Sequence, residues 1–280
     1  MNEIPLVRLP FGETVPAIGL GTWRMGEKSS QRQQEVRALK AGIDLGMNLI
    51  DTAEMYGEGG AERVVADATV DCRDRVFIIS KVYPHNASSS GIPAACHRSL
   101  QRLATDRIDL YLLHWRGSTP LEETVAAFEK LRQEGKIRAW GVSNFDTEDM
   151  SELIQLPDAA QCTTNQVLYN LSRRGIEWSL IPWCRSRNIP IMAYSPIEQG
   201  RLLFHPALDK IAQNHSATPA QVALAWLLAQ QQIISIPKTA NLEHLKEIRA
   251  STQVRLSEQD LTEMNRIFPA PNRPVPLEIL

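Results

Sequence analysis

Short apolar runs alternate along the chain with amphipathic stretches of helical period, from the N-terminal region to the C-terminal region. Most of the apolar runs are continuous, which is typical of strands buried on both faces of a parallel sheet. Counted from the first run, the chain holds eight units of strand followed by helix, and this alternation predicts a (β/α)₈ barrel. The expected strands cover residues 17–20, 48–50, 76–80, 108–113, 139–142, 162–165, 189–193 and 233–236.

Helix start signals separate these strands. Thr119 and Glu122 have the spacing of a capping box, with Pro120 at the first helical position. Similar signals at Thr218 and Ser257 predict two more helices, the second of them an extra helix near the C-terminus. Further helices are expected near residues 31–45, 60–69, 93–104, 146–155, 174–187 and 241–250.

The two ends of the chain depart from the repeating pattern. Residues 4–13 predict a β-hairpin that turns at residues 10–12 and plugs the N-terminal end of the barrel. Residues 269–280 are rich in proline, so we expect an irregular tail that covers part of the site. Because no linker divides the sequence, we expect a single barrel domain over residues 1–280.

Composition narrows the classes of function. With 43% hydrophobic and 22% charged residues, a chain of 280 residues buries a large core. The net charge of −2 argues against nucleic-acid and anionic membrane partners, and no run approaches the ~20 apolar residues of a membrane span. The N-terminal residues lack the apolar core of a signal peptide. Because the sequence does not indicate an exposed apolar patch, we expect a monomer.

Cysteine and histidine spacing bears on compartment and metals. The cysteines form no Cys-x-x-Cys pair, so we expect reduced thiols in a cytoplasmic protein. The histidines show no metal-ligand spacing, so we expect no metal. The four cysteines are Cys72, Cys96, Cys162 and Cys184.

Polar residues stand where the buried strands stop. Asp51, Lys81 and His114 end three strands, and Tyr56 follows five residues after Asp51. The ordinary pKa of a phenol is ~10, and a nearby ammonium favours its ionised form, which would make Tyr56 a better acid. A carboxylate would hold the ammonium in place, and an imidazole would orient a substrate oxygen. This set suits the protonation of an oxyanion that develops on a carbonyl.

Each of these residues has an ordinary structural interpretation when taken alone. Asp51 could cap a helix, Lys81 could be solvated, His114 could be a core histidine and Tyr56 could serve packing. Their joint place at one face of a barrel favours a site. A Schiff-base aldolase with Lys81 as the nucleophile is an alternative.

Several segments carry a family resemblance. Residues 46–57 with Glu62, and residues 236–239, resemble the two signatures of the aldo-keto reductase family. The resemblance extends over about residues 14–268 and is strongest to small bacterial members that reduce methylglyoxal and simple aldehydes. It implies NADPH-dependent reduction of aldehydes and ketones. Further matching segments are residues 19–23, 112–115, 141–145, 165–166 and 193–196.

The resemblance also implies roles for individual residues. Tyr56 would be the proton donor, Lys81 would tune it, Asp51 would anchor Lys81, and His114 would orient the carbonyl. A substrate pocket would be lined by Trp23, Met55, Tyr56, His114 and Trp115. Residues that would contact NADPH are Gly21, Thr22, Trp23, Asp51, Ser143, Asn144, Gln166, Tyr194, Ser195, Pro196, Ile197, Gly200, Arg201, Leu202, Lys238, Thr239, Ala240, Asn241, His244 and Glu247.

The chain departs from the family pattern near the expected 2′-phosphate site. His244 stands where the family usually has arginine, and a neutral imidazole is a weaker phosphate partner than a guanidinium. Ile248 stands where an asparagine is usual. Lys238 still favours NADPH over NADH. A second alternative is a barrel that binds NADPH as a sensor without catalysis.

Overall fold

The apolar runs form one eight-stranded parallel sheet in a computed structural model of the chain, which describes residues 3–280. Each strand pairs with the next in chain order, and a bridge between Ile18 and Ser235 joins the two ends of the sheet. The N–H of Ser235 donates to the carbonyl of Ala17, and the N–H of Gly19 donates to that of Ser235, both at 2.8 Å. The sheet therefore closes into the predicted barrel. Its strands are β3 (Leu20–Gly21), β4 (Leu49–Asp51), β5 (Phe77–Val82), β6 (Ile108–Leu113), β7 (Ile137–Ser143), β8 (Cys162–Leu168), β9 (Ile191–Tyr194) and β10 (Ile233–Ser235).

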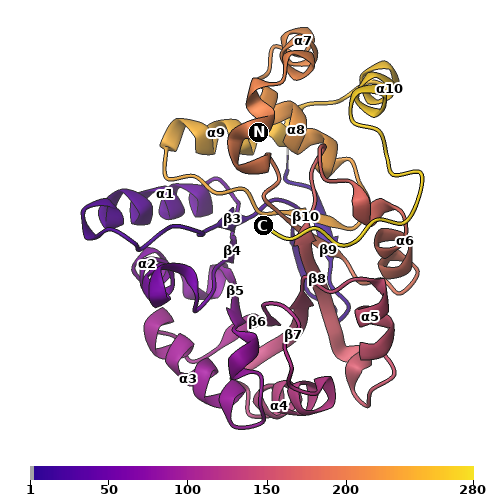
Figure 1. Cartoon of the computed structure of the whole chain (residues 1–280). Coiled ribbons are helices and arrows are strands. Elements are labelled where there is room, and N and C mark those ends of the chain that lie inside the picture. Colours follow the sequence, from indigo (N-terminus) through magenta and orange to yellow (C-terminus); the bar gives the residue numbers. More distant parts are fainter. Residues whose placement is uncertain (1–2) are drawn as a thin grey trace.

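The helices surround the ring of strands (Figure 1). Apolar side chains between the helices and the outer faces of the strands form the larger of two hydrophobic clusters. Helix α10 is the extra C-terminal helix expected from the sequence. The helices are α1 (Arg32–Asp44), α2 (Gly60–Thr69), α3 (Gly91–Leu103), α4 (Leu121–Gln133), α5 (Thr147–Leu153), α6 (Leu180–Arg185), α7 (Pro206–Asn214), α8 (Pro219–Leu228), α9 (Leu242–Ala250) and α10 (Glu258–Ile267).

Two of the three expected helix caps are formed. Thr218 and Ser257 accept hydrogen bonds from the third helical residue and complete capping boxes at α8 and α10. The capping box predicted at Thr119 is wrong. Pro120 has an extended backbone (φ −53°, ψ 132°) and is itself the cap residue of α4, so Thr119 lies one residue too far from the helix.

The single helix expected over residues 174–187 is also wrong. This segment forms a short 3₁₀ helix, η6 (Gly175–Glu177), and then α6. The backbone of Ser179 is not helical (φ −134°), and Pro182 has no N–H to donate within the first turn of α6. The helix is therefore interrupted at Ser179.

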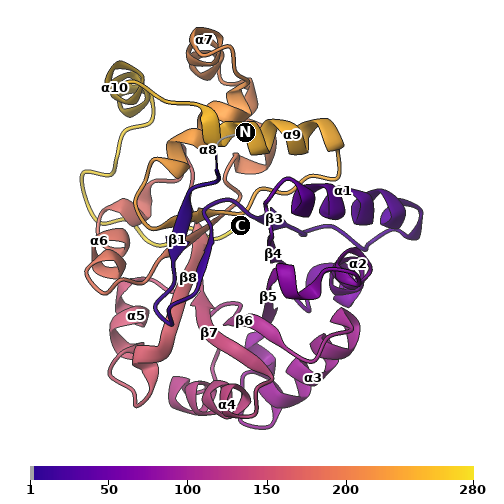
Figure 2. The ribbon, with the colours of Figure 1, turned by 180° about the vertical axis from the view of Figure 1, so that it is seen from behind.

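The expected N-terminal hairpin is confirmed. Strands β1 (Leu6–Arg8) and β2 (Thr14–Pro16) are antiparallel, and Gly12 adopts φ 95° in the turn between them. Val7, Leu9 and Val15 belong to the smaller hydrophobic cluster, which fills the inside of the barrel. Glu13 pairs with Arg138 near the start of β7, so the hairpin covers the N-terminal end of the barrel (Figure 2).

Residues 269–280, called the strap below, contain no helix or strand, as expected from their prolines. The strap leaves α10 and runs across the ring of strands, with its end near the middle (Figure 1). Within residues 3–280, every helix is too short or too polar to cross a lipid bilayer. No cluster of three metal-ligating side chains is found in the same residues.

The hairpin plug gives a stability prediction. Leu9 is 2% exposed inside the barrel, whereas Leu6 on the same hairpin is 66% exposed. Leu9→Ala should lower the free energy of unfolding by about 2 to 5 kcal/mol, because it leaves a cavity in a closed core. Urea-induced unfolding measures this, with Leu6→Ala as the matched control. Equal losses in the two variants would contradict the plug.

Candidate active site

A buried ammonium lies at the centre of the site. Lys81, on β5, is fully buried, and its Nζ atom lies 2.8 Å from a carboxylate oxygen of Asp51 at the end of β4. The same Nζ donates to the carbonyl of Thr52 at 2.9 Å and to the hydroxyl of Tyr56 at 3.2 Å. An ammonium has three N–H groups, so all of them are used. The other Asp51 oxygen accepts a hydrogen bond of 2.7 Å from Gln166 on β8.

These contacts keep Lys81 charged. Burial alone would lower the pKa of Lys81, since it disfavours the charged form. The Asp51 carboxylate and the hydrogen bonds to Asp51 and Tyr56 outweigh burial, and the pKa of Lys81 is raised. A charged ammonium with no free lone pair is a poor nucleophile.

Opposing effects act on the ionisation of Tyr56. Burial and the Asp51 charge raise the pKa of its phenol, while the Lys81 ammonium lowers it, as expected. Burial is the largest of these effects, so the net shift of the pKa is upward. The expectation from the sequence included the ammonium but not the loss of water around the hydroxyl. Tyr56 therefore holds its proton throughout the neutral pH range.

His114 directly follows β6 and is neutral. Burial, helped by the Lys81 charge, lowers the pKa of its imidazole to about 2. Its Nδ1 atom is buried and has no hydrogen-bond partner among the described residues. The ring meets that of Tyr56 edge to face, with centroids 5.8 Å apart, and lies 5.0 Å from the Trp115 ring. Phenol and imidazole therefore meet at one place.

A cavity of about 730 Å³ opens beside these groups. Asp51, Tyr56 and His114 line it together with residues at the ends of β7, β8, β9 and β10, as expected for the C-terminal face of a barrel, while Lys81 lies behind this wall. Its walls are formed by Gly21, Trp23, Arg24, Asp51, Met55, Tyr56, His114, Trp115, Ser143, Asn144, Gln166, Tyr194, Ser195, Pro196, Ile197, Gln199, Gly200, Ile236, Lys238, Ile279 and Leu280.

Several wall residues adopt left-handed backbone conformations that favour glycine. Asn144 has φ 58°, Ser195 has φ 48° and Gln199 has φ 54°. Hydrogen bonds hold two of them: the Tyr194 hydroxyl donates to Asn144 at 3.0 Å, and Asn170 donates to the carbonyl of Ser195 at 2.9 Å. Such backbone strain concentrates at functional sites.

Comparison with known proteins agrees with this geometry. A model of the Aldo/keto reductase family matches residues 17–268. The chain belongs to this family. The aldo/keto reductase is 52% identical over 272 residues to methylglyoxal reductase YeaE of Escherichia coli, covering 95% of this chain and 96% of the relative. It is 34% identical over 262 residues to glyoxal reductase of Bacillus subtilis, covering 93% and 92%.

A solved structure is similar over the whole length. The aldo-keto reductase of Klebsiella pneumoniae, determined in complex with NADPH, has a TM-score of 0.97 and 50% identity and covers 100% of both chains. The resemblance drawn from the sequence motifs is therefore confirmed at the level of family and fold.

The cavity contains most, but not all, of the residues expected to contact cofactor. Thr22 is buried behind the wall and donates to the carbonyl of Asp51 at 2.9 Å. Asn241 caps α9, and His244 is exposed on its first turn. Among residues 3–280, the expected residues outside these walls are Thr22, Arg201, Leu202, Thr239, Ala240, Asn241, His244 and Glu247.

Five wall residues of this aldo/keto reductase were absent from the expected site. The guanidinium carbon of Arg24 lies 4.4 Å from the Trp23 ring centre, and its position beside a predicted wall residue could have suggested it. Ile236 follows β10, two residues before the expected Lys238. The contribution of the strap was foreseen as a segment but not by residue. The five are Arg24, Gln199, Ile236, Ile279 and Leu280.

The neutral state of His114 is testable. Because burial lowers its pKa to about 2, its ring resonances should show no titration midpoint between about pH 5 and pH 9. Nuclear magnetic resonance of ring-labelled histidine, assigned with a His114→Gln variant, measures this, with added free imidazole as the reference. A midpoint in that range would contradict the burial of the ring.

Proposed function

We propose that this chain is an NADPH-dependent reductase of aldehydes and ketones, acting on methylglyoxal and similar small or aromatic carbonyls. One observation carries the proposal: a buried Lys81–Asp51 ion pair holds the Tyr56 hydroxyl beside a neutral His114 in a cavity. The relative with 52% identity is named a methylglyoxal reductase, and a solved relative is complexed with NADPH.

The wall chemistry fits a nicotinamide dinucleotide. Hydroxyl and amide groups of Ser143, Asn144 and Gln166 match the hydrogen-bonding capacity of a carboxamide. Tyr194 offers an aromatic face for stacking. Elsewhere on the wall, Lys238 precedes the N-terminus of α9, where a helix attracts phosphate. These residues would hold the cofactor, which when bound supplies a hydride to the carbonyl carbon.

The side chains of Tyr56 and His114 supply the proton and orient the substrate oxygen. Tyr56 gives its hydroxyl proton to the oxygen as negative charge develops there, and the Lys81 ammonium stabilises the resulting phenolate. As a neutral imidazole, His114 has one N–H. An unpaired buried N–H is costly, and Nδ1 has no partner among the described residues, so the proton belongs on Nε2, which donates to the oxygen.

Two other functions are less well supported. An aldolase needs a neutral amine at Lys81, but its pKa is raised and its three N–H groups are donated. A sensor that binds NADPH without turnover has no need of a proton donor beside a neutral imidazole. No specific observation favours either reading over the reductase.

We further propose that residues 1–280 work as a single domain and a monomer in the cytoplasm. The four cysteines are free thiols, in keeping with a reducing compartment. Sedimentation at several protein concentrations tests the monomer, and fractionation of the host cell tests the compartment.

The test of the reaction is loss of NADPH absorbance with methylglyoxal or a nitrobenzaldehyde. Tyr56→Phe should lower kcat by about 10²- to 10⁴-fold and leave NADPH affinity unchanged, because only the proton donor is lost. Tyr111→Phe is the matched control, because Tyr111 is a buried tyrosine of β6 whose ring packs against Phe128 of α4, outside the cavity. Quenching of tryptophan fluorescence by NADPH without turnover in the wild type would identify a sensor instead.

Lys238 is proposed to bind the 2′-phosphate. Lys238→Ala should therefore weaken the binding of NADPH by roughly ten- to a hundredfold, because a charged hydrogen bond is lost. The binding of NADH, which has no 2′-phosphate, should weaken much less. Fluorescence titration with each cofactor measures this. Lys246→Ala, on α9 and paired with Glu243 at 2.8 Å, is the control. Equal weakening of NADPH and NADH would place the 2′-phosphate elsewhere.

A further inference from the structure

One guanidinium joins two segments that flank the cavity. Arg173 lies in the loop between β8 and α6, and its Nε and Nη2 atoms donate to one oxygen of Glu198 at 3.1 and 2.9 Å. Its Nη1 atom donates to Glu278 on the strap. Glu198 begins η7 (Glu198–Phe204), directly after the wall residues Ser195 and Ile197. Arg173 therefore bridges the loop after β9 and the strap.

The loop end of this bridge is fixed. Glu198 is buried and also accepts hydrogen bonds of 2.8 Å from Asn170 and from Arg201. Burial opposes ionisation of Glu198, but these donors outweigh it and lower its pKa, so it stays charged at neutral pH. Asn170 donates as well to the carbonyl of Ser195. Asn170 and Glu198 therefore fix the position of the Arg173 guanidinium relative to the loop after β9.

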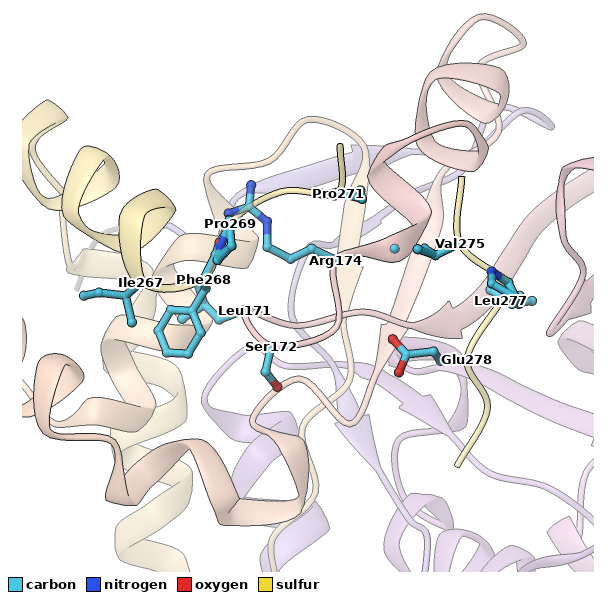
Figure 3. A pocket seen from close by; sticks show the side chains of 12 residues that line it. Leu171, Ser172, Arg174, Ile267, Phe268, Pro269, Pro271, Val275, Leu277 and Glu278 are labelled. Carbon is cyan, nitrogen blue, oxygen red and sulfur yellow. Dashed lines mark hydrogen bonds between the residues drawn. The ribbon is translucent and has the colours of Figure 1, made fainter. Parts of the chain in front are cut away.

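The strap end of the bridge is more exposed: the Glu278 side chain is 45% exposed, against 5% for Glu198. Gly175 allows close approach of the strap, since a Cβ there would lie 2.6 Å from Cγ2 of Val275. A second cavity of about 650 Å³ lies under the strap, which contributes Val275, Leu277 and Glu278 to its lining (Figure 3). The packing beneath the strap is therefore incomplete, and the strap is held there by contacts such as those of Val275 with Gly175 and of Leu277 with the main hydrophobic cluster.

The last two residues carry the strap into the catalytic cavity. Ile279 and Leu280 line it next to Glu278, and the N–H of Leu280 donates to the Tyr194 hydroxyl at 3.4 Å. That hydroxyl donates in turn to Asn144. The strap thus forms an apolar wall whose position is set by Glu278 and Tyr194.

We propose that Arg173 is a positioning residue that latches the strap to the loop after β9, so that Ile279 and Leu280 form the apolar wall contacted by large carbonyl substrates. The inference rests on the proposed reductase function. An aromatic aldehyde fills enough of the cavity to touch this wall, whereas a small dicarbonyl reacts without it. Arg173 therefore favours aromatic over small substrates and leaves the chemistry at Tyr56 unchanged.

The exposure of the pair limits the size of the effect. The side chain of Glu278 is 45% exposed, so its ion pair with Arg173 is partly solvated and is screened by salt. Releasing it should raise KM for the aromatic substrate by about two- to fivefold, the range that such a pair supports. Added salt should produce the same change in the wild type.

The experiment compares Glu278→Gln with the wild type at saturating NADPH. We expect a higher KM for nitrobenzaldehyde, an unchanged kcat, and unchanged kcat/KM for methylglyoxal. Glu263→Gln is the matched control: it removes the same charge from a side chain that is 43% exposed and paired with Arg266 on α10. Salt should raise KM for nitrobenzaldehyde in the wild type and in the control but not in Glu278→Gln.

Hydrogen exchange provides a readout independent of activity. Peptides from the strap should exchange faster in Glu278→Gln than in the wild type, and NADPH should protect them more in the wild type. Equal strap exchange in both proteins, or equal KM changes for both carbonyls, would overturn the latch. If the wild type reduces neither carbonyl, the proposed function fails, and the exchange rates without cofactor alone decide the latch.

Discussion

The burial of one ammonium constrains both the barrel and its site. A charge with no access to water destabilises the fold unless it is paired and hydrogen-bonded. Lys81 meets this requirement only when β4 and β5 are in register, because its partners Asp51, Thr52 and Tyr56 all come from β4 or the turn that follows it. The same register directs the Tyr56 hydroxyl into the cavity. The strand pairing that stabilises the buried charge therefore also places the proton donor.

The electrostatics of the site follow from this pair. Burial raises the pKa of Tyr56 and lowers that of His114, so a protonated phenol and a neutral imidazole stand beside a compensated ion pair. Two neutral donors in water-poor surroundings can both donate hydrogen bonds to one carbonyl oxygen, and the proton that is transferred comes from Tyr56. The Lys81 ammonium then acts most strongly on a charge that forms on the phenol during reaction.

The sequence allowed the barrel and the four central residues to be predicted because both depend on local patterns. Continuous apolar runs identify parallel strands, and parallel strands in a barrel bring their carboxyl ends to one face, so Asp51, Lys81 and His114 had to converge. Balances between opposing effects were not predictable in this way. The sign of the Tyr56 pKa shift depends on how much water burial removes, which no spacing reveals.

Some local backbone details were not predictable either. The capping box predicted at Thr119 is absent because of the backbone angles of Pro120, and the helix predicted over residues 174–187 is interrupted at Ser179.

Contacts between distant segments could not be predicted from the sequence. Arg173 belongs to no recognisable motif, and it matters only because Glu198 and Glu278 lie beside it in the folded chain. The strap was foreseen as a cover, but its wall residues Ile279 and Leu280 depend on where it crosses the ring.

The bridge between Ile18 and Ser235 has a consequence for biosynthesis. While the chain emerges from the ribosome, the first barrel strand can pair with β4, but its other edge lacks a partner until residue 235 of 280 has been made. Until then the nascent sheet has an open edge, which invites pairing with other chains. Contacts of such long sequence separation also slow folding. Ring closure is therefore expected to be a late step, and the unclosed sheet the form most prone to aggregate.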